Sequence, residues 1–128
     1  MAGERVVRIG PEDRIAGEGT PGMVREEAVA SGQMWAGVAR TDAGMVSGWH
    51  HHGEHDSVIY VVSGVLRMES GPGGAEVVEA HPGDFISVPP GAVHREGNPS
   101  NEEARIVVFR SGTGPVVVNV EGPDPGPG

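Results

Sequence analysis

The sequence contains no cysteine among its 128 residues. This absence excludes disulfide bonds, a cysteine nucleophile and thiolate ligands, so any bound metal ion must be held by nitrogen and oxygen atoms. Basic residues are also scarce, since 9 Lys and Arg stand against 18 Asp and Glu and the formal net charge is −9. A nucleic-acid-binding surface needs a basic patch, so we expect no nucleic acid as a partner.

Long hydrophobic runs are lacking as well. No apolar run approaches the roughly 20 residues that a membrane-spanning helix needs, and the first residues lead into no apolar segment of signal-peptide length. We therefore expect no membrane association and a cytoplasmic location. The length fits one domain, which we assign to residues 1–120. Residues 121–128 read EGPDPGPG and offer no apolar side chain for burial, which predicts a disordered tail.

Helical periodicity is also missing, and the chain consists instead of short runs typical of β-strands. Its 22 Gly and 11 Pro are mostly spaced between segments rich in Val and Ile, a pattern that indicates a sandwich or barrel. The predicted strands are 5–9, 23–29, 33–39, 45–49, 57–62, 65–69, 76–79, 84–88, 105–109 and 116–120. Residues 70–74, which read SGPGG, predict a hairpin between two of them. The sequence therefore predicts an all-β fold.

Four of the six histidines lie in residues 50–55, which read HHHGEH. Alternate side chains of a strand point to the same face, so His50 and His52 can converge on one ion while His51 points away. Neutral imidazole is a common ligand of transition metals. Such histidines can also form a pH-sensitive surface patch or be hydrogen-bonded core residues, but the clustering favours a metal site.

A further histidine follows a strand that ends in a Pro-Pro-Gly turn. Pro89 and Pro90 cannot donate hydrogen bonds to a strand ladder, and Gly91 permits the turn. His94 is therefore expected at the start of the next strand, from which it can face the interior. Taken alone, a histidine in this position is more often an ordinary hairpin residue than a ligand.

Together the two segments resemble the two sequence motifs of the cupin superfamily, over about residues 44–109. The second motif is Gly, five residues, Pro, one residue, Gly, two residues, His, three residues, Asn. It is matched in full by Gly83, Pro89, Gly91, His94 and Asn98. The resemblance implies an antiparallel jelly-roll barrel, or double-stranded β-helix, that binds one divalent transition-metal ion such as Fe, Zn, Mn or Ni.

The first motif is matched by His50, His52 and Gly64, and it departs from the family pattern in two places. Its opening glycine is out of register, because Gly44 lies six residues before the first histidine instead of five. The position of a glutamate ligand is occupied by Ser57. The resemblance therefore implies three histidine ligands, His94 included, and leaves the remaining ligand open.

Two neighbouring residues are candidates for the remaining ligand. Asp56 needs a bulge or a loop bend to reach the ion, because it is one residue out of phase. His55 is in phase with Ser57, and some cupins with four histidine ligands resemble that arrangement. We favour Asp56, since a carboxylate offsets the charge of the dication, and keep His55 as the alternative. Glu54 is a less favoured ligand and a candidate general base.

Several other side chains carry expectations about the interior. Arg25 lies on an early predicted strand, where a surface position is expected; facing inward, it could bind an anionic substrate. Aromatic and methionine side chains are expected to line or fill the barrel. These are Met34, Trp35, Tyr60, Met68 and Phe85.

The resemblance implies a mononuclear metalloenzyme that acts on a small organic molecule, like a dioxygenase or like an isomerase or cyclase. Three or four protein ligands leave at least one coordination position for water, oxygen or substrate. The alternative, from another functional class, is a module that binds a sugar or metabolite without turnover. A homodimer is also expected, because symmetric pairs are the commonest oligomers.

Overall fold

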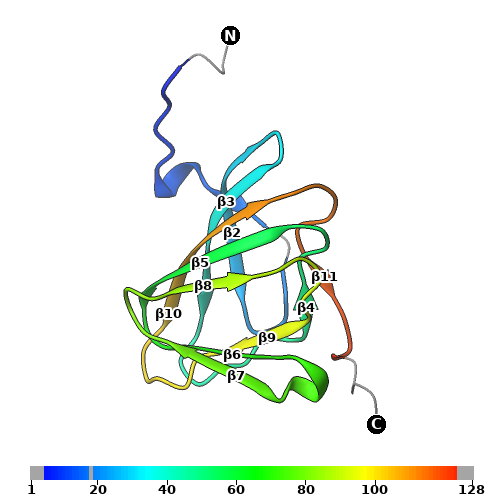
Figure 1. Ribbon diagram of the computed structural model, residues 1–128. Coiled ribbons are helices and arrows are strands. Elements are labelled where there is room, and N and C mark those ends of the chain that lie inside the picture. The colour runs from blue at the N-terminus through cyan, green and yellow to red at the C-terminus, as the bar shows by residue number, and fades with distance from the viewer. Residues whose placement is uncertain (1–4, 18, 124–128) are drawn as a thin grey trace.

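A computed structural model describes residues 5–17 and 19–123, and every strand pair within these residues is antiparallel. The strands form two sheets that curl around a common interior (Figure 1). The larger sheet has the order β1 (Ile15–Ala16), β2 (Val24–Ser31), β3 (Met34–Thr41), β10 (Ala104–Ser111), β5 (Asp56–Ser63) and β8 (Phe85–Val88). The smaller sheet has the order β11 (Val118–Asn119), β4 (His50–His51), β9 (His94–Gly97), β6 (Leu66–Ser70) and β7 (Glu76–Ala80).

The order of the strands confirms the predicted all-β jelly roll. From β4 onward the chain crosses repeatedly between the sheets, so that β3 pairs with β10 and β4 pairs with β9. Helical structure within the described residues is limited to two 3-10 turns, Pro11–Asp13 and Pro72–Gly74. The second turn joins β6 to β7 at the predicted hairpin. No helix in the described ranges has the length and apolar character needed to cross a membrane.

Alternation along each long strand decides which side chains face the interior. In β10, Ala104, Ile106, Val108 and Arg110 are buried, whereas Arg105 and Phe109 at alternate positions are exposed. The period of two thus aligns an apolar row and one arginine on the same inner face.

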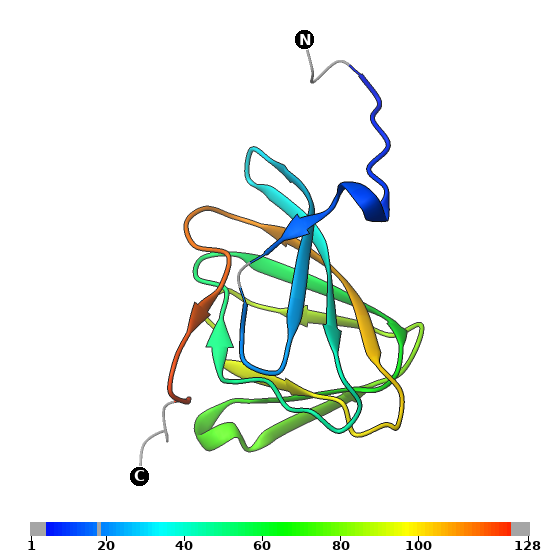
Figure 2. The same cartoon turned by 180° about the vertical axis from the view of Figure 1, so that it is seen from behind.

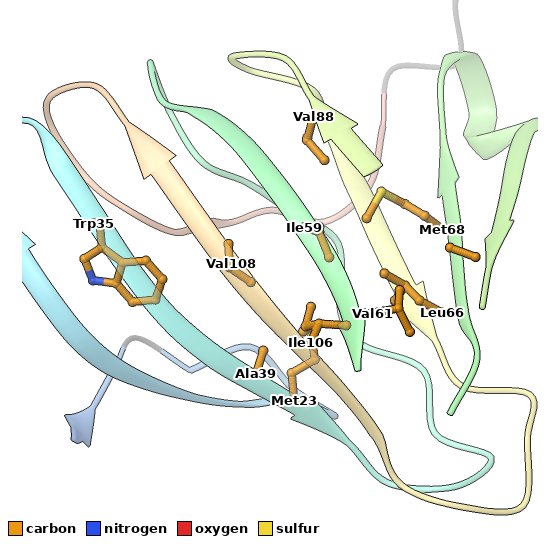
Figure 3. Close-up of a cluster of buried hydrophobic side chains, with 11 residues drawn as sticks. Met23, Trp35, Ala39, Ile59, Val61, Leu66, Met68, Val88, Ile106 and Val108 are labelled. Carbon is orange, nitrogen blue, oxygen red and sulfur yellow. The ribbon is translucent and has the colours of Figure 1, made fainter. Parts of the chain in front are cut away.

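The inner face of the larger sheet carries most of the hydrophobic core, and β6 and β7 complete it from the smaller sheet. Burial of each large apolar side chain contributes roughly 1.5–3 kcal/mol. The buried cluster consists of Met23, Trp35, Ala39, Ile59, Val61, Leu66, Met68, Ala80, Val88, Ile106 and Val108. Figure 3 shows Trp35 at one end of this cluster and Met68 with Leu66 at the other. The indole of Trp35 lies over Gly37, where a Cβ atom would come within 2.6 Å of the ring.

A glycine closes the turn between β5 and β6. Gly64 has a φ of 73°, and a Cβ atom at this position would lie 2.6 Å from Cα of Ala104. Only glycine fits both the backbone conformation and the close approach of the neighbouring strand. This is the glycine that the first motif places at its end.

Two predicted strands are wrong. Residues 5–9 form no strand; Val6 and Val7 are exposed, and the segment runs away from the barrel (Figures 1 and 2). Residues 45–49 contain only an isolated bridge at Val46, and the strand itself begins at His50. Val and Ile favour extended backbone, but a strand also needs a neighbour to pair with. The strands β1 and β9 lie outside the predicted ranges, although β9 begins at the histidine for which a strand start was expected.

Two of the expected interior side chains are on the wrong face. Met34 and Phe85 are exposed, whereas Trp35 and Met68 are buried. Adjacent side chains of a strand point to opposite faces, so Met34 cannot share the interior with Trp35, and Phe85 lies opposite the inward-facing Ile86 in the same way. Tyr60 is partly buried and stacks on Phe85 at the outer surface, with ring centroids 4.9 Å apart. Of the predicted tail at 121–128, residues 124–128 lie outside the described residues.

Candidate metal centre

Three histidines from two neighbouring strands converge inside the barrel. His50 begins β4, His52 follows that strand directly, and His94 begins β9. His50 and His94 are cross-strand partners, which sets their side chains next to each other. The ligand atoms of the three side chains all lie within 4.8 Å of one another. The exposed fractions are 0% for His50 and His94 and 3% for His52.

Each of these imidazoles is held in place by a main-chain carbonyl. The Nδ1 atoms of His50, His52 and His94 lie 3.0, 2.8 and 2.8 Å from carbonyl oxygens. The three carbonyls belong to Gly48, Val116 and Ala92 respectively. A carbonyl oxygen can only accept a hydrogen bond, so Nδ1 carries the proton and the Nε2 lone pair of each neutral ring is left for a ligand.

The electrostatics of the site keep two of the rings neutral. Burial lowers the pKa of His50 from 6.5 to about 4, and the neighbouring His94 and Arg25 act in the same direction. Burial, together with the charge of Arg110, lowers the pKa of His52 to about 2. A histidine must be deprotonated to bind a metal ion, so both rings are ready for metal binding at neutral pH without first losing a proton.

A buried glutamate lies beside two of the three histidines. Glu96 lies two residues after His94 on β9 and therefore points to the same face. It is 2% exposed, and its Oε1 atom lies 3.5 Å from Nε2 of His94 and 3.9 Å from Nε2 of His50. Burial is the largest influence on Glu96 and opposes its ionisation, but His94, His50 and Arg25 together hold the pKa of the carboxyl well below its usual range. Glu96 is thus a carboxylate at neutral pH.

The residues present fit a metal ion. Two atoms bound to the same ion, each about 2.1 Å away at an angle of 90–110°, lie about 3.0–3.4 Å apart. The distances of Glu96 from His94 and His50, 3.5 and 3.9 Å, are close to this spacing. Nε2 of His50, Nε2 of His94 and Oε2 of Glu96 are buried and have no hydrogen-bond partner within the described part of the chain. Unpartnered buried polar atoms are costly, and a cation would satisfy all three.

The predicted fourth ligands lie outside this group. Asp56 and Glu54 are exposed. His55 is buried, but it borders a different pocket and lies outside the convergent group of histidines. Ser57, at the position of the family glutamate, is buried on β5, and its hydroxyl has no hydrogen-bond partner among residues 5–17 and 19–123. The structure thus brings together His50, His52 and His94, and the carboxylate beside them is Glu96.

Two buried arginines lie close to the histidines. Nη2 of Arg110 is 3.4 Å from Nε2 of His52, and its guanidinium carbon is 4.7 Å from the centre of the Trp35 ring. The expected surface position of Arg25 is wrong, because Arg25 is buried and donates a hydrogen bond to Thr20. Its strand alternates so that this side chain faces the interior.

A small apolar cavity adjoins the centre at His94. Its volume is about 90 Å³, and Met68, Ile86 and Val88 are among its lining residues. A water molecule occupies about 30 Å³ of liquid volume, so this cavity can accept only a few non-hydrogen atoms. The space directly beside the centre therefore suits a small ligand or the reactive end of a larger one.

Sequence reasoning missed Glu96 and Arg110, although the sequence contains a signal for each. Glu96 is in phase with His94 on one strand, and Arg110 is in phase with Ile106 and Val108 on another. A charged residue on an otherwise buried face is the informative exception in a strand pattern.

Comparisons with known proteins agree with this architecture. A family model described as "Cupin domain" matches residues 37–110. No curated protein matches the chain. Among solved structures, the polyketide cyclase RemF from Streptomyces resistomycificus is 20% identical, with a TM-score of 0.72, and the match covers 91% of this chain and 86% of RemF.

Two further structures are similar in fold. KdgF from Halomonas sp. is 23% identical with a TM-score of 0.65, and the match covers 82% of this chain and 94% of KdgF. An oxalate oxidase in complex with glycolate is 19% identical with a TM-score of 0.64, and the match covers 77% of this chain and 55% of the oxidase. At these identities the likeness establishes the fold alone.

Proposed function

This chain belongs to the cupin family, and on that premise we propose that it is a mononuclear metal-dependent enzyme of the isomerase or cyclase type that acts on a small organic molecule. The observation that carries the proposal is the set of three buried imidazoles, His50, His52 and His94, whose Nδ1 atoms are bound to main-chain carbonyls. Nothing in the hydrophobic packing of the barrel needs three neutral histidines at its centre, whereas a transition-metal site does.

The proposed ligand set is these three histidines and Glu96. Three neutral imidazoles leave the whole charge of a divalent ion uncompensated, and the buried carboxylate of Glu96 offsets part of it. A mixed set of nitrogen and oxygen donors suits Fe, Zn, Mn or Ni. With Glu96 as the fourth ligand, neither Asp56 nor His55 is needed.

The proposed chemistry follows from the site and its surroundings. A bound divalent ion supplies Lewis acidity to a carbonyl or hydroxyl oxygen of the substrate. The walls exclude water, because the three histidines and Glu96 are almost fully buried. Arg110 and Arg25 add fixed positive charge, which stabilises negative charge as it develops on a substrate oxygen.

This electrostatic surrounding favours isomerisation or cyclisation, in which an enolate-like charge forms, over oxygen activation. The likeness to RemF, a polyketide cyclase, over most of the chain agrees with that choice.

Metal binding is the first test of the proposal. We expect purified protein to bind one divalent ion per chain in competition titrations against a chromophoric chelator. His94→Ala removes one ligand. Its affinity for the metal ion should be roughly 10 to 100 times lower, as is typical when a metal site is disturbed. The matched control is His51→Asn, in the same histidine-rich segment but outside the convergent group, and it should bind like the unmodified protein. Equal affinity in all three proteins would overturn the proposed centre.

The reaction class is tested on the metal-loaded protein. We expect exchange of solvent deuterium into carbon positions next to a carbonyl in a panel of small hydroxy-ketones, followed by proton NMR, because isomerases and cyclases of this type remove such a proton. Oxygen consumption by the Fe(II) form with the same panel would assign the protein to the oxygenases instead. Saturable binding of a panel member with neither exchange nor oxygen consumption would make it a binding module.

A further inference from the structure

The guanidinium of Arg110 is the least satisfied charged group in the interior. It is 4% exposed, and its Nε and Nη1 atoms have no hydrogen-bond partner in the part of the chain that the structure describes. Its remaining contacts are the 3.4 Å approach of Nη2 to His52 and the stacking on Trp35. An incompletely paired buried cation is destabilising, and no described side chain accepts a hydrogen bond from Nε or Nη1, so this guanidinium is suited to bind an anionic ligand.

A second unsatisfied donor lies directly opposite. Arg110 on β10 and Ser57 on β5 are cross-strand partners, and both side chains are buried. Cβ atoms in such pairs are about 4.5–5.5 Å apart, within reach of one small ligand. The hydroxyl of Ser57 has no hydrogen-bond partner among the described residues. Ser57 also stands where the family motif has a glutamate. Because serine is shorter than glutamate, it leaves space for a ligand beside β5.

The balance of buried charges also favours an anionic ligand. Among the described residues, the fully buried side chains with a permanent charge at neutral pH are Arg25, Arg110 and Glu96. Positive charge therefore exceeds negative charge even before a divalent ion is added. One bound carboxylate would offset this excess.

A surface pocket lies on the other side of Trp35. Arg25 and Trp35 line a surface pocket of about 360 Å³, a size within the range of ligand sites. Val116, whose carbonyl holds His52, lines it too. The ring of Trp35 thus borders this pocket and also lies against the guanidinium of Arg110, whose carbon atom is 4.7 Å from the ring centre.

We propose that Arg110 and Ser57 form a binding subsite for a carboxylate group of the substrate, beside the metal centre on which the proposed function rests. The planar fork of a guanidinium matches the two oxygens of a carboxylate, and the serine hydroxyl donates a further hydrogen bond. The substrate class is a small organic acid.

The contact between Arg110 and His52 makes the two binding events interdependent. Nη2 of Arg110 donates to the Nε2 lone pair of His52, which is the lone pair that a metal ion needs. A carboxylate that draws the guanidinium away releases this lone pair and removes the repulsion between two cations. Carboxylate binding therefore strengthens metal binding, and the metal ion strengthens carboxylate binding by the same factor.

The test measures Co²⁺ affinity with and without glycolate, and with glycolamide as a neutral analogue of the same shape. In the unmodified protein, saturating glycolate should tighten Co²⁺ binding about tenfold after correction for the Co²⁺ that glycolate binds in solution, a coupling of ordinary size. Glycolamide should have no effect. Arg110→Met should bind Co²⁺ at least as tightly as the unmodified protein and show no response to glycolate. The matched control is Arg105→Met, on the same strand but exposed, which should retain the full response.

Two results of this titration would overturn the proposed subsite. An equal glycolate effect in Arg110→Met would mean that glycolate acts through the metal ion alone. Absence of any effect in the unmodified protein would also reject the subsite while leaving the metal centre intact. Methionine has nearly the volume of the arginine stem, and replacement of a buried charge by an apolar side chain is often neutral or stabilising, so the variant should fold. Ser57→Ala provides a second variant, in which glycolate binding should weaken several-fold without loss of Co²⁺ binding.

Metal-free protein separates the subsite from the proposed function. In excess EDTA, glycolate should still raise the melting temperature of the unmodified protein but not that of Arg110→Met. If Co²⁺ does not bind but this stabilisation is found, the carboxylate subsite stands and the metal-dependent function fails. If Co²⁺ binds but glycolate stabilises neither form, the subsite fails and the metal centre stands.

Discussion

Acid should destabilise the metal-free protein well above the pH at which carboxylates are usually protonated. The reason is the buried, neutral His50, whose pKa is about 4 in the folded chain and 6.5 in the unfolded chain. Above pH 6.5 both states are neutral at this ring, and its full contribution to stability is present. As the pH falls from 6.5 towards 4, only the unfolded chain takes up the proton, so stability decreases.

The magnitude follows from the size of the pKa difference. Each pKa unit corresponds to about 1.4 kcal/mol, so the loss from His50 alone reaches about 3 kcal/mol, most of it by about pH 4.5. For a domain of this length that loss lowers the melting temperature by roughly 10 °C. His52 adds a loss of the same sign, because its folded pKa is lower still, at about 2. Glu96 acts in the same direction as the pH falls below its ordinary pKa of 4.5.

Guanidinium denaturation of EDTA-treated protein at about pH 8, 6 and 4.5, followed by tryptophan fluorescence, measures this loss. His50→Asn removes the titrating ring, so the decrease in unfolding free energy between pH 8 and 4.5 should shrink by about 2.5 kcal/mol. His51→Asn, on the same strand, should keep the full decrease. A flat profile for the unmodified protein, or an unchanged slope in His50→Asn, would refute the reasoning.

Three further predictions concern stability. A divalent ion at about 100 times its dissociation constant should raise the unfolding free energy by about 2.7 kcal/mol and that of His94→Ala by at most about 1.4 kcal/mol, as followed by thermal denaturation. Ile59→Ala, at a position only 2% exposed in the core, should cost about 2–5 kcal/mol in urea denaturation; a loss below 1 kcal/mol would show that the core refills the space. Arg95→Ala breaks a 2.7 Å ion pair with Glu69 at a partly exposed position, and double-mutant cycles should give a coupling of at most about 1 kcal/mol.

The fold and the three histidines could be predicted because their signals are local. A period of two set His50 and His52 on one face, and a Pro-Pro-Gly turn set His94 at a strand start. These features depend on a few consecutive residues and on backbone rules that hold in any strand. The predictions were less reliable where a strand needs a partner, as at residues 5–9, and where the expected interior residues included two neighbours on one strand, as at Met34 and Trp35.

The surroundings of the histidines depend on contacts between distant parts of the chain. That Arg110 lies opposite Ser57 and beside His52 follows from the pairing of β10 with β5 and from the folding of β4 across the barrel. No local pattern contains that information. Glu96 was not predicted for a different reason. The family motif has its carboxylate in the first histidine segment, whereas Glu96 lies on the strand of His94.

The main-chain anchors of the three imidazoles have a consequence for how such a protein can evolve. The carbonyls of Gly48, Ala92 and Val116 orient the rings, and every amino acid supplies the same carbonyl. Substitutions at the anchoring positions preserve the orientation of the rings provided that the backbone keeps its path. Side chains on the inner walls can therefore be exchanged for others that suit a new substrate while the metal ligands stay in place. For protein engineering, this makes the walls of the barrel the natural place to alter specificity.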